Sequence, residues 1–120
     1  MRFIKQSDCY LDSKTGYEWS LRSYRAMSWD KALEFCVNMN GAWGLPSIEE
    51  LLTLVDYKKF DPATEMPGML SSGCWSSSPY YASSSSHAWY INFTGGNVYY
   101  TNKENRYYVR AVRNSARRLK

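Results

Sequence analysis

The stretch Gly41-Ala-Trp-Gly-Leu-Pro-Ser-Ile-Glu-Glu-Leu51 carries the clearest local signal in the chain. Ser47 and Glu50 have the S-x-x-E spacing of a capping box, in which each side chain accepts a hydrogen bond from the backbone N–H of the other residue. Pro46 fixes the direction in which the chain enters this box. We therefore predict a helix that begins at Ser47, with a buried face formed by Ile48, Leu51, Leu52 and Val55.

Upstream of this helix, residues 10–19 favour a hairpin. Residues 13–16 supply turn chemistry, and Tyr17, Trp19 and Leu21 alternate onto one face. Between the hairpin and Ser47, a second helix is predicted over residues 28–39, with Ser28 as its N-cap and Asn40-Gly41 at its end. The apolar positions of this second helix follow helical spacing, and they are Trp29, Ala32, Leu33, Cys36 and Val37.

Downstream, residues 57–70 contain two prolines and a glycine and are expected to form an irregular loop. From Ala88 onward the pattern alternates, so that Trp89, Ile91 and Phe93 should face the core while Tyr90 and Asn92 face the other side. Turns at 94–96 and 102–106 separate this strand from strands at 97–101 and 107–113. The expected scaffold residues are Trp19, Trp29, Leu33, Cys36, Leu45, Ile48, Leu51, Leu52, Trp75, Trp89, Ile91, Val98, Val109 and Val112.

The predicted fold class is therefore α+β: an N-terminal hairpin, two helices, a loop and a C-terminal antiparallel meander in one domain over residues 1–120. The net charge of +4 is concentrated at the end of the chain, where residues 113–120 form a predicted basic tail containing Arg113, Arg117, Arg118 and Lys120. No predicted helix or strand carries a basic stripe, so nucleic acid is not an expected partner.

No apolar run is long enough to span a bilayer, and residues 1–12 lack the apolar middle of a signal peptide. The sequence leaves the compartment unknown, with the cytoplasm, a virion or a larger surface assembly as the expectations. Cys9, Cys36 and Cys74 cannot all pair with one another, and none has the C-x-x-C spacing of a zinc or redox site. We expect reduced, mostly buried thiols, with Cys9 as the one candidate for exposure.

Residues 71–110 hold seven tyrosines, nine serines and four asparagines but a single acidic residue, Glu104. Antibody paratopes use this chemistry, because tyrosine gives a large contact area at low entropic cost while serine and asparagine add adaptable hydrogen bonds. The alternative interpretation is that the tyrosines are ordinary strand residues covering a solvated sheet, with Tyr108 the best case, and that residues 83–86 are a flexible loop tip. The predicted ligand-binding residues are Tyr80, Tyr81, Ser83, Ser84, Ser85, Ser86, His87, Tyr90, Asn92, Asn97, Tyr99, Tyr100, Asn102, Asn105 and Tyr107.

Catalysis and metal binding are not predicted. His87 is the sole histidine and has no carboxylate near it in the sequence, so a catalytic triad would need a distant aspartate. Calcium requires several oxygen ligands, and Glu104 is the only acidic residue beyond Glu65. We therefore expect no cofactor, and a protein or glycan ligand bound by aromatic stacking and hydrogen bonds.

Residues 41–51 resemble the W-R-L-P-[ST]-x-x-E-L signature of the Lcl C-terminal domain family. Further matches to the family pattern follow in order, and they are Thr15-Gly16 with Trp19, then Trp29, Ala32 and Cys36, then Trp75-Ser76-Ser77, Ala88-Trp89 and Tyr108–Arg113. Two positions depart from the pattern. Gly44 replaces the usual arginine, which removes one expected buried polar contact. Ala111 replaces a cysteine that, in the family, resembles a partner for the helix cysteine, so Cys36 is expected to stay a reduced thiol here.

The resemblance implies a C-type-lectin-like fold, similar also to the formylglycine-generating-enzyme group, with an adaptable binding face on a rigid scaffold. It implies in addition that the chain could be a variable protein of a diversity-generating retroelement. Mutation of the adenines in AAY codons can yield tyrosine, asparagine, serine and histidine but never tryptophan, lysine or glutamate, a rule with which the predicted surface is compatible. Two alternatives stay open: a fixed adhesin or structural domain that forms homo-oligomers through the same surface, and an enzyme remnant with a reactive Cys74.

Overall fold

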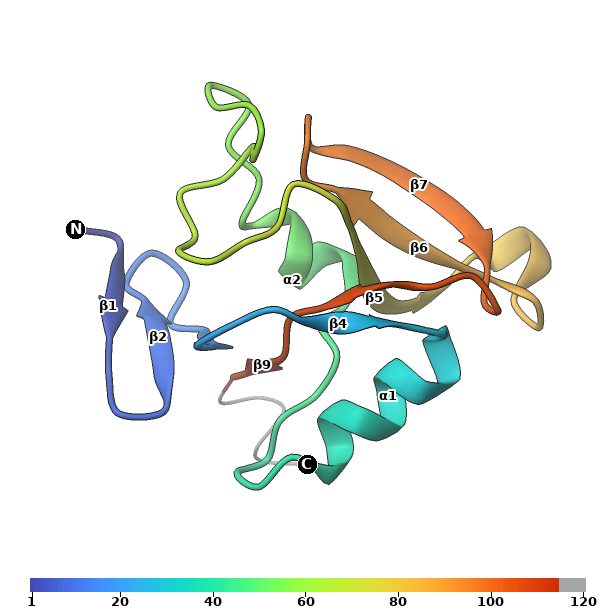
Figure 1. Cartoon of the computed structure of the whole chain (residues 1–120), viewed down its shortest axis with the longest axis horizontal. Coiled ribbons are helices and arrows are strands. Elements are labelled where there is room, and N and C mark those ends of the chain that lie inside the picture. Colours follow the sequence, from blue (N-terminus) through green and yellow to red (C-terminus); the bar gives the residue numbers. More distant parts are fainter. Residues whose placement is uncertain (115–120) are drawn as a thin grey trace.

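The computed structural model describes residues 1–114, which fold into two sheets and two short helices (Figure 1). The strand order is β1-β2-β3-β9 in one sheet and β4-β8-β5-β6-β7 in the other. Among the described strands, the β5–β8 pair is parallel and the other pairs are antiparallel. The elements are β1 (Phe3–Lys5), β2 (Cys9–Asp12), β3 (Glu18–Ser20), β4 (Tyr24–Met27), α1 (Trp29–Asn38), α2 (Ile48–Leu52), β5 (Gly73–Pro79), the 3-10 turn η1 (Tyr81–Ser83), β6 (His87–Asn92), β7 (Asn97–Asn102), β8 (Tyr107–Val109) and β9 (Val112–Arg113).

The N-terminal hairpin is confirmed as the β2–β3 pair, in which Tyr10 lies opposite Trp19. Its turn is closed by the N–H of Gly16, which donates to the carbonyl of Asp12 over 2.7 Å, and Gly16 has the positive φ of +80° that favours glycine. The buried carboxylate of Asp12 accepts from Arg2 at 2.9 and 2.8 Å. This ion pair attaches the turn to β1, a strand that was not predicted.

The helix signals are confirmed, but the predicted buried face of each helix needs one correction, at Val37 in α1 and at Leu52 in α2. The capping box of α2 is complete: Ser47 N–H donates to Glu50 Oε1 over 2.8 Å, and Glu50 N–H donates to Ser47 Oγ over 3.1 Å. Ser28 occupies the N-cap position of α1, although its side chain makes no capping bond. Val37, predicted to be buried, is 70% exposed. The buried stripe of α1 is rotated away from Val37, because Phe35 packs against Tyr24 with ring centroids 4.7 Å apart.

The predicted C-terminal meander is only half present. Strands β6 and β7 form a hairpin, but β8 does not continue from β7, because it lies between β4 and β5 instead. The predicted strand 107–113 is also split, with β8 and β9 in different sheets. The break falls at Arg110, whose buried guanidinium donates to the carbonyls of Ser20 and Pro67 at 2.8 and 2.9 Å. Periodicity identifies strands but not their neighbours, so the sequence could not reveal this crossover.

Two apolar clusters fill the interior. One lies between α1 and the five-stranded sheet and contains Trp29, Cys36 and Trp75, and the other lies around α2 and contains Trp19, Leu51 and Ile91. Of the expected scaffold residues, Trp19, Trp29, Cys36, Leu45, Leu51, Trp75, Ile91, Val109 and Val112 are buried. Leu33, Ile48 and Trp89 are half-buried. Leu52 and Val98 were wrongly assigned to the interior, since they are 38% and 37% exposed.

Arg113 was predicted to begin a basic tail, but it is a buried residue of β9. Its guanidinium pairs with Asp8 and Glu18, each at 3.0 Å, and stacks over the Trp43 ring. Arg117, Arg118 and Lys120 lie outside the described residues. Within residues 1–114, no helix combines the length and the apolar character that a bilayer-spanning segment needs.

All three cysteines are buried thiols, which corrects the expectation that Cys9 is exposed. Cys9 lies in the same apolar cluster as Cys36, and its Sγ donates to Gln6 Oε1 over 3.2 Å. Burial raises the pKa of the Cys9 thiol, and it raises the pKa of the Cys74 thiol to about 12. Both thiols are therefore protonated at neutral pH, which makes them poor nucleophiles.

Candidate binding surface

The β6–β7 hairpin carries the aromatic residues that the sequence singles out. Its ladder is regular over six residue pairs, from His87 opposite Asn102 to Asn92 opposite Asn97. Residues directly opposite one another share a face. Tyr90 and Tyr99 therefore lie on one face of the hairpin, and Trp89 and Tyr100 lie on the other.

None of the predicted ligand-binding residues is buried, yet they do not share one face. The exposed ones are Tyr81, Ser84, Ser85, Asn97, Tyr99, Tyr100, Asn102 and Asn105. The half-buried ones are Tyr80, Ser83, Ser86, His87, Tyr90, Asn92 and Tyr107. The rings form two groups, which we call the Tyr90 cluster (Tyr90, Tyr99 and Tyr107) and the Tyr100 cluster (Tyr80, Tyr81, Trp89 and Tyr100).

The Tyr90 cluster is built on the buried indole of Trp75. The rings of Tyr90 and Tyr107 stack with centroids 4.2 Å apart, and both meet Trp75 edge-on. Tyr99 extends the cluster outward, 5.7 Å from Tyr90 and 44% exposed. Such ring pairs contribute about 0.5–1.5 kcal/mol beyond the burial of their area. Tyr90 and Tyr107, predicted to present their rings to a ligand, are half-buried and form a packed base, and Tyr99 is the most accessible ring of the three.

Gly73 makes this base possible. A Cβ at position 73 would lie 2.2 Å from Cδ1 of Tyr107, closer than any real contact. The absence of a side chain lets the Tyr107 ring lie directly against the backbone of β5. Position 73 thus determines where the Tyr90 cluster sits, although it carries no functional group.

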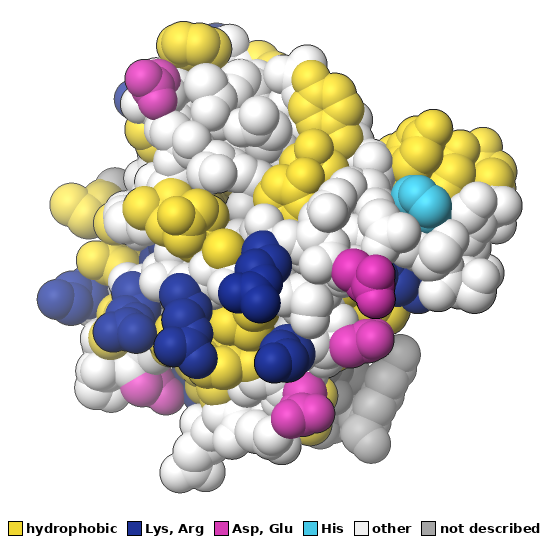
Figure 2. All heavy atoms as spheres, turned by 45° about the vertical axis from the view of Figure 1, so that its right-hand side comes forward, with side chains coloured by type: hydrophobic (Ala, Val, Ile, Leu, Met, Phe, Trp, Pro, Cys, Tyr) yellow, Lys and Arg dark blue, Asp and Glu magenta, His cyan; other side chains and the backbone are white. Residues whose placement is uncertain are grey.

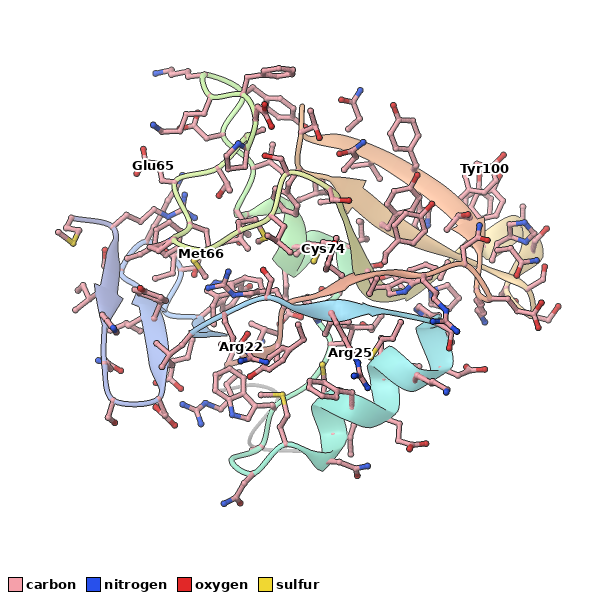
Figure 3. The ribbon with its side chains drawn as sticks, in the orientation of Figure 1. Arg22, Arg25, Glu65, Met66, Cys74 and Tyr100 are labelled. Carbon is pink, nitrogen blue, oxygen red and sulfur yellow. The ribbon has the colours of Figure 1, made fainter. Side chains whose placement is uncertain are left out.

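The Tyr100 cluster lies at the far end of the hairpin, where Figure 3 labels Tyr100. Tyr80 and Tyr100 are stacked almost parallel, with centroids 3.8 Å apart and an interplanar angle of 2°. Trp89 meets both of these rings edge-on, at 5.1 Å from Tyr80 and 5.6 Å from Tyr100. Tyr81 and Tyr100 form its open rim, with exposed fractions of 83% and 50%. In Figure 2 the sole histidine, in cyan, lies beside a yellow group of hydrophobic side chains at the right, and the centroid of the His87 ring is 6.1 Å from that of the Tyr100 ring.

The phenols of Tyr80 and Tyr90 are held in their neutral form. Burial raises the pKa of Tyr90 to about 12, assisted by the hydrogen bond with Tyr107. The pKa of Tyr80 is also raised, by loss of solvent and by the adjacent Tyr100 hydroxyl. These two phenols are therefore uncharged at neutral pH.

The predicted polar residues mostly support the turns beside the clusters. Asn92 Oδ1 accepts from Thr94 N–H at 3.0 Å, and Asn102 Oδ1 accepts from Glu104 N–H at 2.9 Å. Asn105 donates to Thr101 Oγ1 over 2.6 Å. Asn97, Ser84 and Ser85 are exposed, which leaves their side chains accessible at the hairpin ends. Asn102 and Asn105 therefore combine a role in the turn with an exposed side chain, whereas Asn92 is half-buried.

His87 lies 2.7 Å from Ser86 Oγ through its Nδ1, but no carboxylate of residues 1–114 bonds to the imidazole. A Ser–His contact without an orienting acid lacks the third member of a triad. In the same part of the chain, no group of three or more His, Cys, Asp or Glu side chains could hold a metal ion.

Comparison with family models matches residues 8–113 to the Lcl C-terminal domain. The chain belongs to the Lcl C-terminal domain family. No curated protein sequence matches it. The match includes the β6–β7 hairpin and both aromatic clusters, so the candidate surface is part of this Lcl C-terminal domain rather than an addition to it.

The two departures from the family pattern have local explanations in this Lcl C-terminal domain. Gly44 is held through its backbone, because its N–H and C=O pair with Val112 at 3.0 and 2.9 Å. Ala111 lies in the same apolar cluster as Cys36. Alanine at position 111 thus contributes apolar packing to the cluster that holds the helix thiol.

Two features of the Lcl C-terminal domain escaped the sequence argument. Trp89 belongs to the candidate surface, and the signal was its place between His87 and Tyr90. Two adjoining hollows beside β4 and α1 are lined by the basic residues Arg22, Arg25, Lys31 and Arg106, and the larger hollow has a volume of about 530 Å³. Figure 2 shows a band of basic side chains across the front of the molecule. They come from separate segments, so no single predicted element displayed a basic stripe.

Proposed function

We propose that this Lcl C-terminal domain is a non-enzymatic binding module with a C-type-lectin-like fold, whose two aromatic clusters take a protein or glycan ligand. The observation that carries the proposal is the exposure of Tyr81, Tyr99 and Tyr100, at 83%, 44% and 50%, on a base of packed rings. Tyr81 and Tyr100 lie together around Tyr80 on one face, and Tyr99 lies on the other. Monomeric proteins rarely leave large apolar patches at the surface without a partner for them. A rigid base also lowers the entropic cost of binding.

The proposal is tested by screening protein and glycan arrays with the wild type and with a Tyr99→Ala, Tyr100→Ala variant. Anchoring tyrosines commonly contribute more than about 1 kcal/mol each, so the affinity of a true ligand should fall at least about tenfold. Phe60→Ala is the matched control, because Phe60 is 73% exposed and lies outside both clusters. An unchanged set of ligands in the double variant would refute the assignment of the surface.

The finer proposal is that the exposed positions are diversified by a retroelement. It is supported by the residue types at the exposed positions, which are tyrosine, serine and asparagine, the products that AAY codons permit. Tyr90 and Tyr107 belong to the packed base, so we expect variation at Tyr81, Tyr99 and Tyr100 rather than there. Sequencing the gene's surroundings tests this proposal: a reverse transcriptase and a near-copy of the last third that differs at adenines is expected, and their absence would contradict it.

A second candidate is a fixed structural or adhesin domain that self-associates through the same surface. The lack of charge on β7 favours this alternative, because two copies would not repel there. Sedimentation equilibrium separates the two candidates. If the Tyr99→Ala, Tyr100→Ala variant loses self-association, and neither protein binds an array ligand, the second candidate holds.

A further inference from the structure

Strand β7 is one end of the five-stranded sheet, and among the described strands its neighbour is β6. Its sequence, Asn97-Val-Tyr-Tyr-Thr-Asn102, has no charged residue and no proline, and all of its residues except Thr101 are exposed. The ladder with β6 has no bulge. Proteins usually guard an edge strand with charges, prolines, bulges or inward-pointing polar groups, because an open edge pairs readily with another strand. Within its six residues β7 has no charge, proline or bulge to guard it.

The opposite edge of the same sheet, strand β4, is protected against the addition of another strand. Strand β4 has four residues, its register with β8 shifts between Tyr24 and Met27, and it carries the exposed Arg25. A bulge and a charge both discourage strand addition. The sheet is therefore asymmetric, with one guarded edge and one open edge that carries the aromatic clusters.

The hydrogen-bond pattern of the hairpin identifies the groups that β7 offers. Lys103 N–H donates to Ser86 O at 2.8 Å, directly beyond the pair formed by Asn102 and His87. In an antiparallel ladder, alternate residues turn their N–H and C=O groups toward the partner strand. Counting back from Lys103, Tyr99 bonds toward β6, whereas the backbone groups of Val98 and Tyr100 point outward. The edge presents donors and acceptors at the spacing of an extended peptide.

The side chains at this edge face both ways. Tyr99 belongs to the Tyr90 cluster and Tyr100 to the Tyr100 cluster, on opposite faces of the hairpin. A strand laid beside β7 would place successive side chains on these two faces in turn. A ligand reaching only one face would touch one cluster, whereas an added strand would touch both.

We propose that β7 accepts an extended, uncharged segment of a partner protein as a sixth strand of the sheet, with apolar or aromatic side chains packing alternately on Tyr99 and Tyr100. This inference rests on the proposed function and names its ligand class. An extended peptide fits better than a glycan, because a peptide backbone repeats N–H and C=O groups in the order that Val98 and Tyr100 require. The uncharged edge offers no ion-pair partner to a charged segment.

The test begins with a random nonapeptide library displayed on phage and selected against the immobilised wild type. Each of the two best peptides is synthesised unmodified and as two isomers, N-methylated on one or the other set of alternate residues. Only one set of amides can face β7. The isomer methylated on that set should bind about tenfold more weakly than the unmodified peptide, and the affinity of the other isomer should stay within about twofold of it. Amide hydrogen exchange at Val98 and Tyr100 should slow at least about tenfold in the complex.

Two variants at position 98 test the hydrogen bond that the outward backbone N–H of Val98 would donate to the peptide. Val98→Pro removes an outward N–H while leaving the β6 ladder donors in place, and Val98→Thr keeps that N–H in a residue of similar shape. Peptide affinity should fall about tenfold for the proline variant alone. The proline variant's circular dichroism spectrum checks that it is folded, and the N-methylated isomers provide the same comparison without altering the protein.

Each other outcome overturns the inference. Peptides that bind equally well in both N-methylated forms, and leave Val98 and Tyr100 exchanging freely, would show side-chain binding alone, which contradicts strand addition but leaves the proposed function intact. A library without binders, or glycan ligands only, would exclude the peptide class. Exchange that slows with protein concentration in the absence of peptide would assign the edge to a second copy of this chain. If the wild type bound no peptide, protein or glycan at all, the proposed function itself would be refuted.

Discussion

At the scale of the residue, Arg110 shows how a single side chain redirects the chain. It is fully buried, burial lowers its pKa to about 10, and its bonds run to the carbonyls of Ser20 and Pro67 and to Ser23 Oγ. A planar guanidinium can reach several acceptors at once. Arg110 thereby connects the small sheet to the long loop at the point where β8 ends.

Arg110→Lys should lower the free energy of unfolding by about 2–3 kcal/mol, because one ammonium cannot serve these acceptors and a buried carbonyl left unpaired costs about 1–3 kcal/mol. Urea denaturation provides the measurement. The exposed Arg106→Lys is the control and should change stability by less than about 0.5 kcal/mol. If both substitutions changed the free energy of unfolding equally, the buried contacts of Arg110 would make no particular contribution to stability.

Gly73→Ala should also destabilise the protein, by about 1–3 kcal/mol, because its Cβ would overlap the Tyr107 ring at 2.2 Å. A double-mutant cycle with Tyr107→Ala isolates the cause. In the Tyr107→Ala background the glycine substitution should cost much less, since the ring is gone. Strict additivity of the two substitutions would show that Gly73 matters for some other reason.

At the scale of the element, the phenol of Tyr90, whose ring stacks on Tyr107 of β8, makes β6 sensitive to alkaline pH. The pKa of Tyr90 is raised from 10 to about 12, so the unfolded chain loses this proton at a lower pH than the folded protein. The contribution of this shift to the free energy of unfolding is complete below pH 10 and is lost as the pH rises toward 12.

The free energy of unfolding of Tyr90→Phe should therefore fall less steeply than that of the wild type between pH 10 and pH 12. Denaturation curves recorded at several pH values for both proteins give the comparison. Tyr81→Phe, at an exposed ring, should leave the wild-type slope unchanged. If the wild type and Tyr90→Phe lose stability in parallel, the Tyr90 phenol is not linked to folding.

The elements also differ in how far the sequence predicted them. The capping box of α2, the β2–β3 hairpin and the β6–β7 hairpin were predicted because their signals are local. Strands β1 and β4, of three and four residues, are too short to display a period. Val37 was misplaced because the face of α1 that becomes buried depends on Phe35 meeting Tyr24, a contact from outside the helix.

At the scale of the whole molecule, the candidate surface was predicted in composition but not in shape. Alternation placed Tyr90 and Trp89 on opposite faces, but it wrongly put Trp89 in the core, since Trp89 packs in the Tyr100 cluster. Nor could it show that β8 crosses the sheet and brings Tyr107 onto Tyr90. The expected single face is instead two clusters on either side of one open edge. The residues that cover a sheet come from distant parts of the chain, and a single sequence does not reveal them.

The most direct test of the account is nitration of the tyrosines with tetranitromethane, read by mass spectrometry, on the protein alone and in complex with a selected ligand. We predict that Tyr81, Tyr99 and Tyr100 react first in the protein alone and are protected in the complex, while the exposed Tyr57 reacts in both. If these three rings were protected without ligand, or stayed as reactive as Tyr57 in the complex, the aromatic clusters would not be the binding surface.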